Sequence, residues 1–374
     1  MSVTGNSMFN RDRFLLGTFA TNCSSGMTVT KAEGRWNNSW DNNLRLARML
    51  DAAGIDFMLP IARWIGYGGE TNFHGGVLET MTWAAGLLAQ TSNINVFATI
   101  HTVANHPVVV AKQLATIDQI SHGRVGLNIV AGWNKPEYEA LGLDLPADHE
   151  SRYGYAQEWF DIVKALWTRT EAFDWDGTYF KLKNVLGDPR PASPLPILNA
   201  AGSAQGRDFA VRNADFLFTP AIDLERSREE VAELKAHGET VGRDVDVLTF
   251  SHVVCRPTEK EAQDFLKHTA DTNADWDAVD NLIRLQFAHA QSFPHDLLAL
   301  IRSRMAAGHG GFPLTGTPEQ VAEGLIALHK AGFGGTTLSF VDYAEEFPYF
   351  RDTVLPLLAE HGIRPAVKAA EAAE

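Results

Sequence analysis

Neutral polar and aromatic residues follow several short apolar segments of the chain, and an arginine stands among them. Arg63 and Trp64 follow one apolar run, Thr99 closes the next, and Asn128 and Trp133 belong to the third. Hydroxyl, amide and indole groups beside a single cation suit a large planar cofactor that carries the difficult chemistry itself. We therefore expect a cofactor-dependent site rather than a site built on side-chain nucleophiles.

A second set of residues could bind the phosphate of such a cofactor. Gly202 and Ser203 precede a predicted helix at 203–213, whose first backbone N–H groups can bind an anion. Arg152 and Tyr153 begin an earlier helix and could add a guanidinium and a phenol. A plain serine cap beside a surface arginine explains the same residues, so both interpretations stay open.

Residues needed for metal or hydrolytic chemistry do not gather in the sequence. His101 and His106 have no acidic partner nearby, so no metal site is expected. Glycosidases need two facing carboxylates, whereas Glu137 and Asp118 resemble a loop acid and a helix-surface acid. No G-x-S-x-G motif is present. Cys23 is expected to be a small buried or pocket-lining residue rather than a nucleophile.

Charge and composition narrow the class of protein. The chain has 374 residues and a net charge of −14, which disfavours binding to nucleic acid or to an anionic membrane. Cys23 and Cys255 cannot form a disulfide framework. No apolar signal core and no apolar run of about 18 residues occurs. We expect a cytoplasmic protein that acts on a small-molecule substrate.

The elements that must position these residues alternate between apolar runs and amphipathic patterns, as in a parallel α/β protein. Strands are expected at 14–20, 55–60, 94–100, 125–131, 195–200, 214–219, 245–254 and 336–341. Helices are expected at 40–53, 78–88, 106–120, 156–167, 203–213, 227–237, 321–328 and 349–358. About eight such units close a barrel, whose active site lies at the C-terminal ends of the strands.

The predicted fold is α/β, a single decorated (β/α)8 TIM barrel over residues 1–374 with insertions at 170–194 and 258–312. The first insertion is expected to be irregular, and extended helices are expected over 258–305. An open doubly wound sheet is the structural rival. Against it, no G-x-G-x-x-G follows the first strand.

Several strings resemble the bacterial-luciferase-like family of flavin-dependent monooxygenases, and within it the pyrimidine monooxygenases that open the uracil ring. They are IGYGGETNF (65–73), FATIHT (97–102), VAKQLATIDQISHGRVGLNIVAGWNKPEYEALG (110–142), SRYGYAQEW (151–159) and RNADFLF (212–218). The resemblance returns at 314–325 and 338–350. Sulfone and alkanesulfonate monooxygenases share the QLATID segment, so the resemblance indicates the family more strongly than the substrate.

The resemblance implies a luciferase-like barrel that forms a homodimer or homotetramer. It also implies reduced FMN, supplied by a separate NAD(P)H-dependent flavin reductase, and O2 as co-substrate. The flavin contacts it implies, with Gly202 added from the phosphate argument, fall on Ala62, Arg63, Asn128, Glu137, Arg152, Tyr153, Gly202 and Ser203. The oxygen site falls on Thr99 and Asn128, and the expected substrate pocket includes Cys23, Trp64 and Trp133.

The function expected is a two-component flavin monooxygenase that cleaves a C–N or C–S bond of a small pyrimidine-like N-heterocycle or organosulfur compound. A flavin N-oxide or a peroxyflavin would transfer the oxygen. The alternatives are a deazaflavin-dependent dehydrogenase, a non-catalytic flavin-binding barrel and a metal-dependent hydrolase. Arg63, where the pyrimidine enzymes have lysine, is expected to contact substrate or the polar edge of the flavin rather than a structural acid. At 74–77 the chain has a smaller, less polar run than those enzymes.

Overall fold

Eight parallel strands close into a barrel in the computed structural model, which describes residues 6–146, 148–286 and 295–366. Each strand pairs in parallel with its neighbours, and β1 closes the ring by pairing with both β2 and β11. The barrel strands are β1 (Leu15–Phe19), β2 (Phe57–Leu59), β3 (Asn95–His101), β4 (Val125–Val130), β7 (Ile197–Ala200), β8 (Phe216–Phe218), β9 (Asp246–Cys255) and β11 (Gly335–Ser339). The predicted TIM barrel and all its strands are confirmed.

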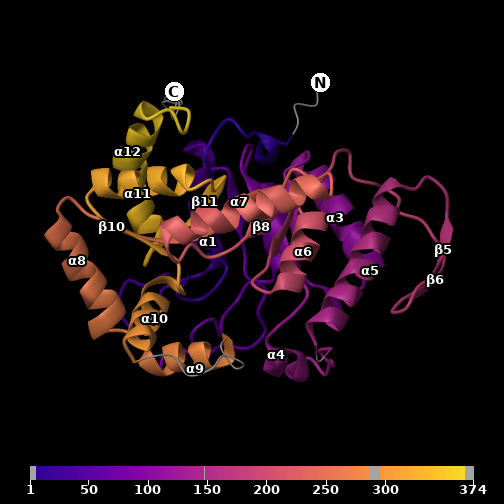
Figure 1. The fold of residues 1–374 in the computed structure, drawn as a ribbon, viewed down its shortest axis with the longest axis horizontal. Coiled ribbons are helices and arrows are strands. Elements are labelled where there is room, and N and C mark those ends of the chain that lie inside the picture. Colours follow the sequence, from indigo (N-terminus) through magenta and orange to yellow (C-terminus); the bar gives the residue numbers. More distant parts are fainter. Residues whose placement is uncertain (1–5, 147, 287–294, 367–374) are drawn as a thin grey trace.

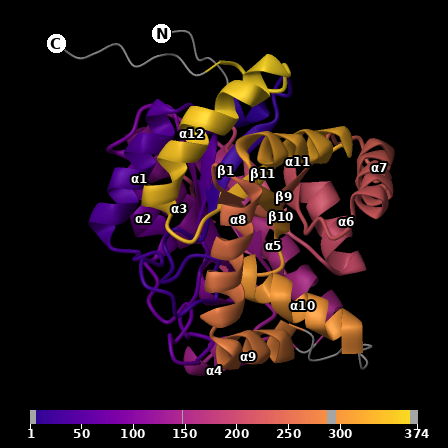
Figure 2. The same cartoon turned by 90° about the vertical axis from the view of Figure 1, so that its left-hand side faces the viewer.

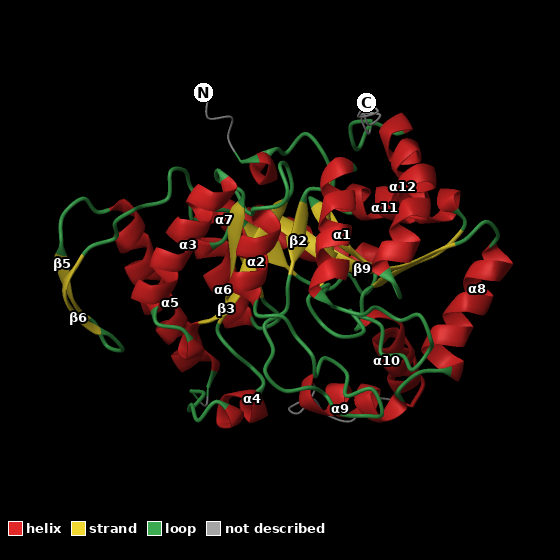
Figure 3. Cartoon of the chain, turned by 180° about the vertical axis from the view of Figure 1, so that it is seen from behind, coloured by secondary structure: helices red, strands yellow, loops and turns green. Residues whose placement is uncertain are grey.

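Helices surround the strands on every side, as Figure 3 shows. The barrel helices are α1 (Trp40–Ala52), α2 (Thr80–Leu88), α3 (Pro107–Ser121), α5 (His149–Thr168), α6 (Ala204–Asn213), α7 (Leu224–Thr240), α11 (Pro318–Lys330) and α12 (Tyr343–Glu360). Their apolar faces pack on the outside of the barrel in one large core cluster. None of the described helices combines the length and the apolar character needed to cross a bilayer.

The barrel interior is filled by large side chains that need glycine opposite them. Phe57 and Phe97 belong to the inner cluster, and their rings lie edge to face at 5.8 Å. A Cβ atom at Gly17 would lie 2.6 Å from the Phe57 ring, and one at Gly126 would lie 2.5 Å from the Phe97 ring. Because such contacts are sterically impossible, these glycines let the inner layer close.

Additional elements extend the loops at the C-terminal ends of the strands. They are the short 3-10 turn η2 (Thr102–Ala104), α4 (Lys135–Ala140), α8 (Glu259–Lys267), the π-helical turn η3 (His268–Thr272), α9 (Trp276–Gln286), α10 (His295–Gly308) and β10 (Phe312–Gly316). Another 3-10 turn, η1 (Ser7–Phe9), precedes β1. Helices α4, α9 and α10 gather beyond one end of the barrel in both views (Figures 1 and 2). This end is the one at which the predicted site residues emerge.

One sequence expectation about the segments outside the barrel is corrected, and two elements were not predicted. The segment 170–194 is not irregular, because β5 (Phe173–Asp176) and β6 (Lys181–Val185) form an antiparallel hairpin that projects from the barrel (Figure 3). Its strands are mostly polar and carry the Lys183–Asp174 ion pair at 2.9 Å, so they lack the apolar signal of a strand. Strand β10, which pairs with the outer half of β9, and helix α4 were also not predicted.

Candidate active site

Arg63 lies just after β2 and forms an ion pair with Glu137 of α4. The Arg63 Nη1 to Glu137 Oε2 distance is 3.2 Å, and the two side chains are 6% and 1% exposed. The other carboxylate oxygen, Oε1, accepts the backbone N–H of Trp64 at 2.8 Å. The expectation that Arg63 does not contact a structural acid is therefore wrong, whereas its expected contact with substrate or with the polar edge of the flavin stays a prediction. Glu137 is not a simple loop acid, because it holds the loop after β2 against α4.

The same arginine remains part of an aromatic site. Its guanidinium carbon lies 4.7 Å from the Tyr67 ring centroid and 5.5 Å from that of Trp133. Trp64 and Trp133 are themselves 42% and 38% exposed. These two indoles are thus the exposed faces beside a buried ion pair, and their place at a substrate pocket stays a prediction.

Thr99 and Asn128 are direct neighbours on adjacent parallel strands, paired in register between β3 and β4. The Asn128 amide Nδ2 donates to Thr99 Oγ1 at 3.1 Å, and Thr99 Oγ1 donates to the Pro60 carbonyl at 2.6 Å. Within the described part of the chain, Asn128 Oδ1 has no hydrogen-bond partner. The threonine proton is engaged by Pro60, so the amide of Asn128 is the group of this pair with remaining capacity.

The residues expected at a phosphate meet at the start of α6. Ser203 caps this helix and accepts the Gly206 N–H at 3.1 Å. Burial raises the pKa of the Tyr153 phenol, while a hydrogen bond with Ser203 opposes that shift. A Cβ atom at Gly206 would lie 2.3 Å from the Tyr153 hydroxyl, so glycine is needed for this approach. Gly202 is exposed.

Arg152 is adjacent to Tyr153 on α5, and its guanidinium donates hydrogen bonds to two backbone carbonyls outside this helix. Its Nε donates to the Pro146 carbonyl at 2.8 Å, and its Nη1 donates to the Gly132 carbonyl at 3.3 Å. Arg152 therefore positions the loop that carries Trp133. A contact between Arg152 and the cofactor phosphate stays a prediction.

Cys23 and Ala62 are buried beside the site. Burial raises the pKa of the Cys23 thiol to about 12, while the nearby Arg63 acts weakly in the opposite direction. A thiol held in its neutral form is a poor nucleophile, which agrees with the packing role expected from the sequence.

A histidine–tyrosine pair in this region was not predicted. His101 Nδ1 lies 2.9 Å from the Tyr138 hydroxyl, and the His101 ring contacts Trp64 edge to face at 5.2 Å. Burial, with a smaller contribution from Arg63, lowers the pKa of His101 to about 3. The histidine was visible at a strand end, but its partner lies on the short helix α4, which the sequence pattern did not reveal.

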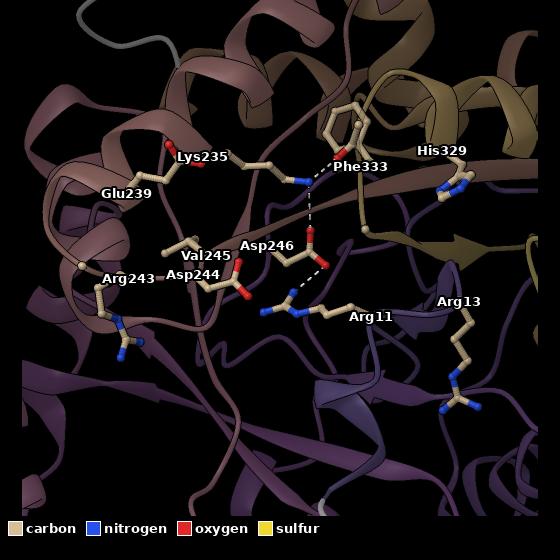
Figure 4. Close-up of a pocket in the computed structure, with 13 residues that line it drawn as sticks. Arg11, Arg13, Lys235, Glu239, Arg243, Asp244, Val245, Asp246, His329 and Phe333 are labelled. Carbon is tan, nitrogen blue, oxygen red and sulfur yellow. Dashed lines mark hydrogen bonds and ion pairs between the residues drawn. The ribbon is translucent and has the colours of Figure 1, made fainter.

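Two cavities lie at the opposite end of the barrel. The larger, of about 780 Å³, is bordered by the segments preceding β1, β9 and β11 (Figure 4). Its cations are engaged: Arg11 pairs with Asp246 at 2.5 Å, and Lys235 donates to the Gly332 carbonyl at 2.8 Å. The other, of about 450 Å³, precedes β7 and β8. In a barrel this end serves stability, so neither cavity is the candidate site.

No three of the His, Cys, Asp and Glu side chains in the described ranges are grouped so as to hold a metal ion. The expectation that no metal is bound stays a prediction. The candidate site is therefore built from neutral donors, aromatic faces and one neutralised ion pair.

Comparisons with known proteins agree with this fold. The luciferase-like monooxygenase family model matches residues 15–335. The FMNH2-dependent dimethylsulfone monooxygenase of Pseudomonas fluorescens is 31% identical over 91% of this chain and 93% of its own length. The pyrimidine monooxygenase RutA of Rhizobium rhizogenes is 30% identical over 95% and 99%. The DmoA structure from Hyphomicrobium sulfonivorans superposes with a TM-score of 0.84, at 19% identity over 95% of this chain and 90% of that one. The resemblance seen in the sequence is thus confirmed, and the chain belongs to the luciferase-like monooxygenase family.

Proposed function

We propose that the protein is a two-component monooxygenase that uses reduced FMN and O2 to cleave a C–N or C–S bond of a small organic substrate. The observation that carries the proposal is that one end of a luciferase-like barrel, the C-terminal end of its strands, holds both the Ser203–Tyr153 contact and the Thr99–Asn128 pair. The dimethylsulfone and pyrimidine relatives support both bond types, so the substrate is a pyrimidine-like heterocycle or an organosulfur compound.

The residues present fit a phosphorylated flavin. The N-terminus of α6 offers backbone N–H groups, the Ser203 hydroxyl and the Tyr153 phenol, with the Arg152 guanidinium one residue away on α5. The unpartnered Asn128 Oδ1 and the neutral groups around it suit the polar edge of a planar ring. Reduced FMN would supply the electrons that activate O2. Ala62, Gly202 and Arg63 would lie along the same cofactor.

Thr99 and Asn128 are proposed to bind O2 as it gains electron density. The Asn128 side chain has two N–H groups on Nδ2, and one of them donates to Thr99 Oγ1 at 3.1 Å, which orients the amide. The second N–H is the proposed direct donor to O2. Neutral donors suit this task, because a charged group would be costly to desolvate in an apolar site. Glu137, which is enclosed, holds Arg63 and the Trp64 backbone rather than meeting the cofactor itself.

A separate NAD(P)H-dependent flavin reductase would supply the reduced flavin, and the protein is proposed to act as a cytoplasmic homodimer or homotetramer. Sedimentation at micromolar concentration tests the assembly. A species of 41.1 kDa alone would contradict it.

The experiment that tests the function supplies chemically reduced FMN under air and screens heterocycles and organosulfur compounds by mass spectrometry. An oxygen-dependent mass change that is absent under nitrogen supports the proposal. Turnover with a reduced deazaflavin under nitrogen would instead indicate a dehydrogenase. Tight flavin retention without oxygen consumption beyond that of free flavin would indicate a non-catalytic flavin-binding barrel.

A further inference from the structure

A cluster of neutral side chains with unused hydrogen-bonding capacity lies beside Arg63, whose guanidinium carbon is 4.7 Å from the ring centroid of one member, Tyr67. Tyr67 and His74 come from the loop after β2, and both are 1% exposed. His309 comes from the turn after α10. The ring centroids are 5.9 Å apart for Tyr67 and His74 and 6.1 Å apart for His74 and His309, whose rings are nearly parallel at 10°. We call Tyr67, His74 and His309 the histidine cage.

The structure determines which nitrogen of His74 carries hydrogen. His74 Nε2 lies 2.5 Å from the Gly26 carbonyl oxygen, which can only accept, so Nε2 is the donor. Burial, followed by the neighbouring His309, lowers the pKa of His74 well below its usual range, so the ring is neutral. Its Nδ1 is therefore a bare acceptor. This atom is buried and has no partner among the residues that the structure describes.

His309 presents the opposite polarity. The Gln286 amide nitrogen lies 2.7 Å from His309 Nε2, and an amide NH2 group can only donate, so this ring nitrogen accepts. Burial and the charge of Arg63 lower the pKa of His309, so its ring is also neutral and its hydrogen is on Nδ1. His309 is partly exposed as a residue, but Nδ1 is buried and without a partner in the described ranges. The cage thus presents one acceptor and one donor.

The cage has no net charge to offer an ion. Burial raises the pKa of Tyr67 to about 12, so the phenol is neutral, and its hydroxyl also lacks a partner among the described residues. The charge of Arg63 is balanced by Glu137 at 3.2 Å. An anion placed here would lose its hydration without gaining a net counter-charge. A neutral ligand would not pay that cost.

Aromatic rings border the histidine cage, and such rings suit a flat ligand that can stack on them. The Phe73 ring stacks on His74 at 3.9 Å, and Tyr67 lies 4.7 Å from the Arg63 guanidinium carbon. His74 adopts the left-handed backbone region, with φ of 56°, and His309 does so with φ of 55°. Non-glycine residues occupy that region at a cost, and such strain gathers at ligand sites.

We propose that His74 and His309 recognise the substrate, and that they select a small, neutral, planar compound with an N–H donor beside a carbonyl acceptor, such as a cyclic amide. His74 Nδ1 accepts the ligand N–H, and His309 Nδ1–H donates to the ligand carbonyl. Unpaired buried donors and acceptors are costly, so a ligand that satisfies both gains affinity over one that satisfies neither. This inference rests on the proposed function, since it names the substrate class of that site.

The test compares three probes of similar size by isothermal titration of the purified protein, with and without excess FMN. δ-Valerolactam carries both groups, N-methyl-δ-valerolactam lacks the donor, and valerate is an anion. We expect the lactam to bind at least about tenfold more tightly than either of the others, the range of one well-made hydrogen bond. Equal affinity for the lactam and its N-methyl derivative, or tighter binding of valerate, would overturn the proposal.

Variants assign the preference to the cage. His74→Phe keeps a ring to stack on Phe73 but removes the acceptor, so the preference for the lactam over its N-methyl derivative should fall to about one. His74→Asn is the second variant, because asparagine tolerates the left-handed backbone and retains an acceptor. If His74→Phe does not fold, His74→Asn replaces it in the test and should keep part of the preference for the lactam. His329→Phe, at the opposite end of the barrel, is the control and should bind like the parent.

Reduced FMN affinity, measured separately, distinguishes this inference from the proposed function. Lactam selectivity that depends on His74, in a protein that binds no reduced FMN, would support the cage and contradict the monooxygenase. Reduced FMN binding with a folded His74→Phe variant that keeps the full lactam preference would contradict the cage alone.

Discussion

The two ends of the barrel use polar residues in opposite ways. At the N-terminal end, Asp56 precedes β2 and is fully buried. Its two oxygens meet Arg13 Nη2 at 2.6 Å and Arg364 Nη1 at 2.5 Å, and one of them also accepts the Leu16 N–H at 2.8 Å. Arg13 and Arg364 come from the beginning and the end of the described chain. At the N-terminal end of the barrel, the Asp56 carboxylate is thus paired with two guanidiniums, and this cluster holds both ends of the described chain against the barrel.

At the C-terminal end, neutral groups keep unused capacity. Asn128 Oδ1, Tyr67 Oη and His74 Nδ1 are buried and lack partners in the described part of the chain. Leaving such atoms unpaired is costly for folding, and natural proteins seldom do so without a ligand or water to satisfy them. The contrast teaches that a cavity alone is a poor guide here. The two cavities described above lie at the end where charges are already paired.

The largest effect is expected from breaking the N-terminal cluster. Asp56→Ala leaves the Arg364 and Arg13 guanidiniums without their carboxylate, so the free energy of unfolding should fall by about 3–5 kcal/mol. Chemical denaturation measures this loss. Asp352→Ala removes the exposed Arg351–Asp352 pair and should change stability by less than about 1 kcal/mol. Equal losses in both variants would remove the distinction between the ends.

A smaller effect, on turnover rather than on stability, is expected from Thr99→Val at the C-terminal end. The change keeps the shape, removes the hydroxyl that orients Asn128, and should lower product formation by roughly 100-fold. Reduced FMN affinity should stay within about twofold of the parent, with electrons diverted to hydrogen peroxide. Thr82→Val, which alters an exposed hydroxyl on α2, is the control. Parent-like turnover by Thr99→Val would show that this pair is not the oxygen site.

Arg152→Ala separates the phosphate contact from loop positioning. The guanidinium holds the Gly132 and Pro146 carbonyls, and that loss affects FMN and riboflavin alike. Only FMN has the phosphate, so reduced FMN should lose roughly ten- to a hundredfold more affinity than reduced riboflavin. Fluorescence titration under nitrogen measures both. Arg212→Ala, at the last turn of α6, is the control. Equal weakening of the two flavins would leave Arg152 with its structural role alone.

The fold could be predicted because its signals are local. Each barrel strand is a short apolar run, and β3 is buried at every position, so the pattern of a parallel strand is plain. The polar hairpin β5–β6 and the short helix α4 carry no such pattern. The individual candidate residues at strand ends could be predicted for the same reason, because β3 and β4 carry Thr99 and Asn128 in matching register.

The residues that these candidates contact could not be predicted from the sequence. Arg63 meets Glu137, and His74 meets His309, across long stretches of chain that no local periodicity relates. The Glu137 carboxylate resembled an ordinary loop acid because burial is a property of the packed structure. Recognition of the family located Glu137 at the site, but only the structure shows that its two oxygens are already engaged by Arg63 and Trp64.

The smallest effect tests whether the neutral groups of the C-terminal end cost stability in acid. His252 lies on the outer half of β9 and is 2% exposed, and neither ring nitrogen has a partner among the described residues. Burial, with a smaller contribution from Arg256, lowers its pKa from the ordinary 6.5 to about 4. Between these values the unfolded chain binds a proton that the folded chain does not. Stability is therefore complete above pH 6.5 and falls on acidification, by up to about 1.4 kcal/mol per pH unit for this residue.

His252→Leu should remove that contribution. Urea denaturation at pH 7.5, 6.5 and 5.5 should show the parent losing about 1 kcal/mol more than the variant over the lowest step. Other buried histidines, such as His101, remain in both proteins and cancel in the comparison. His361→Leu, which changes an exposed ring after α12, should leave the pH dependence of the parent unaltered. Parallel curves for the parent and His252→Leu would mean that the pKa of His252 is not lowered in the folded protein. This buried ring would then not distinguish the C-terminal end from the N-terminal cluster around Asp56.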